Sequence, residues 1–190
     1  MGAYYFLVSQ LPYLIFGQQP PMSSEAFKDL AKPLLSAGDA AFLDLVSLDP
    51  LPCDEEAPSC GCAFIDSWRE WDRTMRLNLA KQRAAKIGRE NANVADAPFL
   101  PVEAVAAAAK AVASSESPLD GEMLIDRARW NAVEAFQGID YFGINSILAY
   151  QLKLLLLERR ELFQEETGFA EYKSIYSSIV ESISPAGETK

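Results

Sequence analysis

The sequence predicts a mostly α-helical protein, a bundle of long antiparallel helices with at most one short strand near the amino terminus. Three observations favour this class. Apolar residues recur at helical spacing over 64–79, and a leucine-rich stretch, 152–157, lies inside a second long helical pattern. Proline, glycine and serine separate these segments with short breaks. Long helices joined by short loops usually pack as antiparallel neighbours.

The amino-terminal segment combines strand-like residues with a predicted helix. Residues 4–8, Tyr-Tyr-Phe-Leu-Val, have the aromatic and β-branched content of a short strand, which Pro12 would limit. The alternative is an apolar segment without strand structure that lies across the helices. Ser23 is expected to cap the first helix, in which apolar residues recur every 3.6 positions. Pro33 should kink or restart that helix, because proline lacks an N–H group and clashes with the preceding turn.

A short second helix and a loop follow. Gly38 and Asp39 are expected to stop one helix and cap the next, which runs through residues 42–46. Residues 49–62 contain three prolines, a glycine and three cysteines, and they show no periodicity. This composition predicts an exposed loop.

The clearest amphipathic stripe predicts a long helix over about 64–90. Its apolar members follow at spacings of four, three, four and four: Phe64, Trp68, Trp71, Met75 and Leu79. A linker over 91–101 and an alanine-rich helix over 102–113 are expected next.

The carboxyl-terminal half predicts three further helices. The first begins at Ser117-Pro118, since proline favours the first helical position, and ends at Gly138. The second covers 144–166, and a shorter one covers 169–183. The large aromatic side chains are expected in the core: Trp68, Trp71, Trp130, Tyr141 and Phe142.

The 190 residues predict one helical domain over 1–190. A second interpretation divides it into two degenerate helical units, 1–92 and 102–184, joined by a 93–101 linker. Within this interpretation Asp72–Arg83 and Ala149–Arg160 would be equivalent helices.

Composition excludes several classes of function. The chain has no histidine, so it lacks Ser-His-Asp and Cys-His catalysis and the HExxH zinc motif. The glycine-rich phosphate-binding motifs G-x-x-x-x-G-K-S/T and G-x-G-x-x-G are both absent. We therefore expect no enzyme and no cofactor. The formal charge of −10 argues against binding to nucleic acid or to anionic lipid. No apolar run approaches the roughly 20 residues that span a bilayer, and no signal peptide is evident, so a cytoplasmic location without a direct membrane span is expected.

Three cysteines, Cys53, Cys60 and Cys62, lie in the predicted loop. Three thiolates could bind zinc or an iron–sulfur cluster with a nearby acid as fourth ligand, but the paired spacing of structural zinc sites is absent. The favoured interpretation is three reduced cysteines in a variable loop and no metal.

The 64–90 helix is unusually basic. It carries seven basic and four acidic residues, a net charge of +3, which leaves −13 for the rest of the chain. One interpretation is an ordinary solvated face with pairs such as Glu70 and Arg73. The other is a basic ridge that faces an acidic protein partner, because segregated charge sets partner choice. The residues proposed for that contact are Arg69, Arg73, Arg76 and Arg83, and the Arg76/Arg83 face is expected to touch the partner.

Three stretches resemble an uncharacterised, DUF2764-like bacterial family that is typically encoded beside V-type ATPase genes. They are residues 4–12 (YYFLVSQLP), 68–76 (WREWDRTMR) and 118–130 (PLDGEMLIDRARW). The last of these, with the leucine-rich helix that ends Glu-Arg-Arg, is also similar to one repeat of the V-type ATPase component designated C in prokaryotes and d in eukaryotes. That component is a longer, all-helical socket for the central stalk, and we refer to it as the stalk socket.

The resemblance implies a mechanical role: a non-catalytic helical adaptor that contacts other proteins of an assembly, such as the stalk or ring of a V-type ATPase. It would be peripheral to the membrane through that complex. The alternative from a different class is a free-standing cytosolic helical scaffold or regulatory protein. A metal- or redox-sensing module built on the cysteine loop is a third hypothesis.

Overall fold

A computed structural model describes residues 4–50, 59–88, 102–115, 117–162 and 173–177. Every regular element in these ranges is helical, which confirms the predicted fold class. The elements are α1 Tyr5–Gln10, α2 Ser24–Ala31, the 3₁₀ helix η1 Lys32–Leu34, α3 Ala37–Asp44, α4 Ala63–Lys86, α5 Val102–Ser114, α6 Pro118–Gln137 and α7 Ile144–Glu161.

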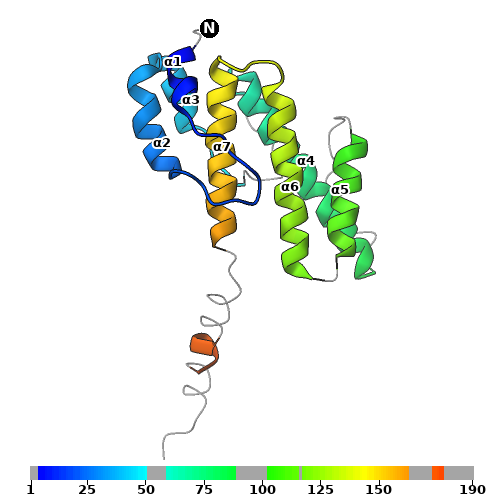
Figure 1. Ribbon diagram of the computed structural model, residues 1–190. Coiled ribbons are helices and arrows are strands. Elements are labelled where there is room, and N and C mark those ends of the chain that lie inside the picture. Colours follow the sequence, from blue (N-terminus) through cyan, green and yellow to red (C-terminus); the bar gives the residue numbers. More distant parts are fainter. Residues whose placement is uncertain (1–3, 51–58, 89–101, 116, 163–172, 178–190) are drawn as a thin grey trace, which may run out of the picture.

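Helix α7 lies at the centre of the bundle, with α1, α2 and α3 on one side and α4, α5 and α6 on the other (Figure 1). Its leucines explain this position. Four leucines on different faces of α7 are each at most 2% exposed: Leu152, Leu154, Leu156 and Leu157. A helix that is apolar on all sides must be covered on all sides, and this agrees with the prediction from its sequence.

The strand predicted over residues 4–8 is wrong, since Tyr5–Gln10 form helix α1. The Tyr4 backbone N–H donates to the Phe142 carbonyl oxygen at 2.6 Å, and the Tyr4 hydroxyl donates to Asp39. Leu7 is buried at 1% exposure. In the described residues there is no strand for this segment to pair with, so packing against the bundle overrides its local β propensity.

Two capping predictions have different outcomes. The Ser23 hydroxyl oxygen accepts from the Ala26 N–H at 3.1 Å, which confirms Ser23 as the cap of α2. The stop and cap predicted at Gly38 and Asp39 are wrong: Ser36 caps α3, its hydroxyl oxygen accepting from the Asp39 N–H at 3.2 Å. Gly38 lies inside the first turn because the helix begins earlier than the glycine suggested.

The long helix α4 ends near Gly88, which has a φ of 72°, slightly before the predicted boundary at residue 90. Gly138 ends α6 with a φ of 56°, as predicted. The predicted end of the last long helix, residue 166, and its stop at Gly168 lie outside the described residues. Of the helix predicted over 169–183, the described part, 173–177, is helical. Among the described residues, no helix is both long enough and apolar enough to cross a membrane.

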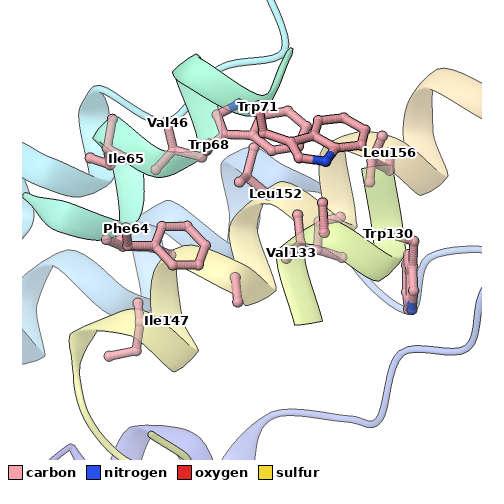
Figure 2. Packing of buried hydrophobic residues seen from close by; sticks show 14 of the residues in the cluster. Val46, Phe64, Ile65, Trp68, Trp71, Trp130, Val133, Ile147, Leu152 and Leu156 are labelled. Carbon is pink, nitrogen blue, oxygen red and sulfur yellow. The ribbon is translucent and has the colours of Figure 1, made fainter. Parts of the chain in front are cut away.

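Aromatic side chains fill the junction between α4, α6 and α7 (Figure 2). Trp68 and Trp71 stack with centroids 5.9 Å apart and an interplanar angle of 15°. Trp130 is 4% exposed, so all three tryptophans are in the core as expected. Tyr141 and Phe142 are not, at 61% and 43% exposure, because the chain turns outward after Gly138 and places them at the end of the bundle.

Two buried polar side chains in this core have atoms without a hydrogen-bond partner among the described residues: the Thr74 hydroxyl on α4 and the Gln151 amide on α7. Gln151 on α7 is 0% exposed, and within the described residues neither its amide nitrogen nor its amide oxygen has a partner. Burying an unsatisfied amide costs about 1–3 kcal/mol. The core therefore tolerates a destabilising group at this position.

We expect Gln151→Met to raise the free energy of unfolding by about 1–2 kcal/mol, because methionine has nearly the same shape and no unsatisfied polar atoms. Urea denaturation followed by circular dichroism measures this change. Destabilisation by Gln151→Met would contradict the absence of a partner for the amide.

Candidate functional site

The predicted basic ridge on α4 is partly used inside the molecule. Arg76 Nε donates to Asp72 Oδ2 at 2.9 Å, and Arg73 lies 4.0 Å from Glu70. The Arg73 and Arg76 side chains are only 13% and 25% exposed. These two arginines therefore stabilise the fold locally and present little charge to a partner.

The other two predicted residues lie far apart. Arg69 lines a small cavity of about 150 Å³ with Trp68, Asp72 and Arg76, beneath the segment that follows α3. Arg83 is exposed near the opposite end of α4. Fourteen residues separate them, about 21 Å along a helix, so the four arginines do not form one compact site.

Charged side chains of α4, α6 and α7 form a shared ion-pair network. Arg129 of α6 reaches Asp72 of α4 at 3.3 Å and Asp126 of its own helix at 3.2 Å. Arg159 of α7 reaches Asp126 at 2.6 Å and Glu122 at 2.7 Å. We call these residues, with Arg76, the central ion network: it ties α4, α6 and α7 together with three acidic and three basic groups.

Asp126 is the most buried member, with 4% of its side chain exposed. Burial raises the pKa of its carboxyl group, because a low-polarity environment disfavours the charged form, while Arg159 and Arg129 oppose that shift. Since the folded-state pKa lies above the unfolded value, the protonated form adds stability at low pH. This contribution is lost as the pH rises through the folded-state pKa. The arginines limit that loss.

Arg159→Met should destabilise the protein by about 3 kcal/mol at pH 7, because it leaves the buried Asp126 carboxylate with Arg129 alone. Protonated Asp126 needs no counter-charge, so the difference from wild type should shrink as the pH falls toward 4. Thermal unfolding at several pH values measures it. Arg160→Met is the matched control on the next residue and should cost less than about 1 kcal/mol. An equal cost for both variants, or no pH dependence, would contradict the role given to the central ion network.

The cysteine loop is held by Asp66 in the first turns of α4. The Asp66 carboxylate accepts from the Ser59 hydroxyl at 2.6 Å and from the Cys60 N–H at 3.0 Å. These hydrogen bonds lower the pKa of Asp66. Burial, with the neighbouring Asp66, raises the pKa of the Cys60 thiol. Burial first, and Asp66 second, thus favour the less reactive, protonated form of Cys60.

The hypothesis of a metal site at Cys53, Cys60 and Cys62 remains a hypothesis, since Cys53 lies outside the described residues. Cys60 and Cys62 are both free thiols, and Cys62 is 7% exposed. In the part of the chain that the structure describes, no group of three or more cysteine and carboxylate side chains is arranged to hold a metal ion.

Cys60 should react slowly with iodoacetamide near neutral pH, because its raised pKa leaves little thiolate. Asp66→Asn should accelerate the reaction by removing the neighbouring negative charge. The rate-against-pH profile, measured in a Cys53→Ala/Cys62→Ala background, gives the thiol pKa in both proteins. If Asp66→Asn left the profile in place, the influence of Asp66 on Cys60 would be disproved.

A groove lies at the end of the bundle where α1 meets the turn between α6 and α7. The two segments are joined by the Tyr4–Phe142 backbone hydrogen bond and by the rings of Tyr5 and Phe142, whose centroids are 4.7 Å apart. The groove has a volume of about 290 Å³. We call it the end groove, and its principal lining residues are Val8, Leu11, Tyr13, Tyr141, Phe142 and Tyr150.

Its rim is aromatic and exposed. Tyr13 is 86% exposed, Tyr141 61% and Phe142 43%, and the neighbouring Ile139 is 92% exposed. Its wall is fixed, since the Tyr150 hydroxyl donates to the Pro12 carbonyl oxygen at 3.0 Å. Burial raises the pKa of Tyr150 to about 12, so this hydroxyl keeps its proton at physiological pH.

Sequence reasoning missed the end groove because it assigned Tyr141 and Phe142 to the core. A local signal was present: Gly138 ends a helix, and several large apolar residues follow it in a turn only a few residues long. Large apolar side chains in such a short turn cannot all reach a core. Their exposure marks the end of the bundle as a candidate interaction surface.

Part of the chain matches a protein-family model. Residues 110–183 match the model of a family described as a protein of unknown function (DUF2764). This region includes α6 and α7, and therefore the turn that bears Tyr141 and Phe142. The match supports the resemblance to an uncharacterised family, over less than half of the chain. No curated protein matches. No solved structure matches either.

Proposed function

We propose that this protein is a non-catalytic helical adaptor that binds another protein at the end groove. The observation that carries the proposal is the exposed aromatic rim formed by Tyr13, Tyr141 and Phe142. Exposed aromatic side chains are costly in water, and tyrosine and phenylalanine are enriched at protein interfaces. The groove is concave and has a fixed wall, so an apolar side chain of a partner could enter it.

The assembly we propose is a V-type ATPase, with its stalk or ring as the partner. This step rests on the resemblance to a family encoded beside V-type ATPase genes and to one repeat of the stalk socket. The fold is compatible with a mechanical part, because the central ion network and a continuous hydrophobic cluster link α4, α6 and α7. A rigid adaptor can transmit or resist force without a catalytic group.

A free-standing cytosolic scaffold or regulatory protein is the second candidate. The same end groove would then receive a partner that is not part of a V-type ATPase. The two candidates differ in the identity of the bound protein, and purification from the native host distinguishes them.

Tyr141→Ser/Phe142→Ser should reduce co-purification of V-type ATPase proteins with the tagged protein by at least about tenfold, because loss of two interface aromatics typically costs more than about 1.4 kcal/mol. Quantitative mass spectrometry of the eluate measures the yield. Both side chains are exposed, but Phe142→Ser also removes the ring contact with Tyr5, so circular dichroism and thermal unfolding check that the variant keeps its fold.

The matched control is Ile175→Ser/Tyr176→Ser, which also replaces two exposed apolar residues, outside the end groove. We expect this variant to retain the V-type ATPase proteins. Unchanged recovery with Tyr141→Ser/Phe142→Ser would remove the end groove as the binding site. Recovery of no V-type ATPase protein by the wild type would reject the V-type assignment.

A further inference from the structure

We propose that Arg127, Arg160 and Phe16 form a second binding site, an arginine clamp that takes the carboxylates of an acidic segment of a protein partner. The proposal rests on the adaptor function in one respect, that the ligand belongs to a protein. It uses different residues from the end groove and a different chemistry.

The clamp is built on a single aromatic ring. The guanidinium carbon of Arg127, on α6, lies 4.0 Å from the centroid of the Phe16 ring, and that of Arg160, on α7, lies 5.2 Å from it. The Phe16 ring is itself fixed by an edge-on contact with the buried Trp130, at 5.5 Å and 72°. Two cations from neighbouring helices are therefore gathered around one anchored ring.

These two arginines differ from the others around them because they have no acidic partner. Within the described residues, neither Arg127 nor Arg160 forms an ion pair. The nearby Lys153 stacks over Trp130 at 5.0 Å but is neutralised by Glu134 at 3.2 Å. The positive charge of the clamp is thus uncompensated, in a protein with a net charge of −10.

The backbone beside the clamp is shaped to admit Arg160. Gly17 has a φ of 91°, which favours glycine, and a Cβ atom there would lie 2.9 Å from Arg160 Nη1. The Arg160 guanidinium group therefore lies close to the Gly17 backbone as well as over the Phe16 ring. Such contacts restrict the side chain, and a restricted side chain loses less entropy when a ligand arrives.

Carboxylates are the ligands that fit this site best among protein groups. Guanidinium groups bind them through two parallel charge-assisted hydrogen bonds, and stacking on the ring leaves the guanidinium edges available. Two like charges near one ring repel each other, and a bound anion would relieve that repulsion. A long polyanion such as nucleic acid would also meet the negative charge of the whole chain, whereas a short acidic segment would not.

The clamp changes where an acidic partner is expected. Charge counting placed that contact on α4, where Arg73 and Arg76 prove to be paired internally. The uncompensated charge lies on α6 and α7, on the side crossed by the segment that follows α1 (Figure 1).

The test is fluorescence anisotropy of a fluorescein-labelled peptide of about six Glu and Asp residues, titrated with the full chain at low ionic strength, where charge-assisted binding is strongest. Arg127→Gln/Arg160→Gln should weaken binding at least about tenfold. The control Lys28→Gln/Lys110→Gln removes the same charge from α2 and α5 and should change the dissociation constant less than about twofold. Phe16→Leu keeps the net charge but removes the ring, and it should also weaken binding.

Three results would overturn the proposal. The first is no binding of the peptide by the wild type, and the second is equal weakening in the clamp variant and the control, which would show a general effect of net charge. The third is displacement of the peptide by inorganic phosphate at an ionic strength at which sodium chloride leaves the peptide bound. That result would indicate a small-anion site. Thermal unfolding of each variant confirms that it is folded. Because binding is measured with purified protein, failure here is distinct from loss of V-type ATPase proteins in co-purification.

Discussion

The arrangement of this protein depends on the pairing of Asp126 with two arginines from two helices. Asp126 is almost fully buried, and its charge is tolerable only because Arg159 of α7 and Arg129 of α6 lie within 3.2 Å. Arg129 continues the contact to Asp72 of α4. Apolar packing brings these helices together. The chain of directional ion pairs adds contacts that are made only when the helices have this relative register.

That register places both proposed binding surfaces. When α6 and α7 are held antiparallel, the turn between them must lie at one end of the bundle, where its aromatic residues meet α1 and enclose the end groove. The same pairing brings Arg127 and Arg160, from two different helices, to one Phe16 ring. Two adjacent residues on α7 thus differ in role. Arg159 forms ion pairs inside the central ion network, whereas Arg160 is available to a ligand in the clamp.

The sequence predicted what local chemistry determines. The hydrophobic period located α4 and α7, Ser23 capped α2, and Gly138 ended α6, because each depends on residues only a few positions apart. The helix at Tyr5–Gln10 was not predictable in this way, since it depends on contacts with Asp39 and Phe142. The central ion network and the clamp likewise join residues distant in sequence. Pairing within α4 is local, and the solvated-face interpretation named the Glu70–Arg73 pair in advance, but the sequence could not show how far Arg73 and Arg76 are buried.

The most direct test of the adaptor proposal is site-specific photo-crosslinking in the native host. A photoreactive amino acid replaces Ile139, which is 92% exposed beside the end groove, or, as a control, Asp29, which is exposed on α2. We predict that position 139 crosslinks to a V-type ATPase protein and position 29 does not. A native complex in which position 139 captures no V-type ATPase protein would contradict the proposal.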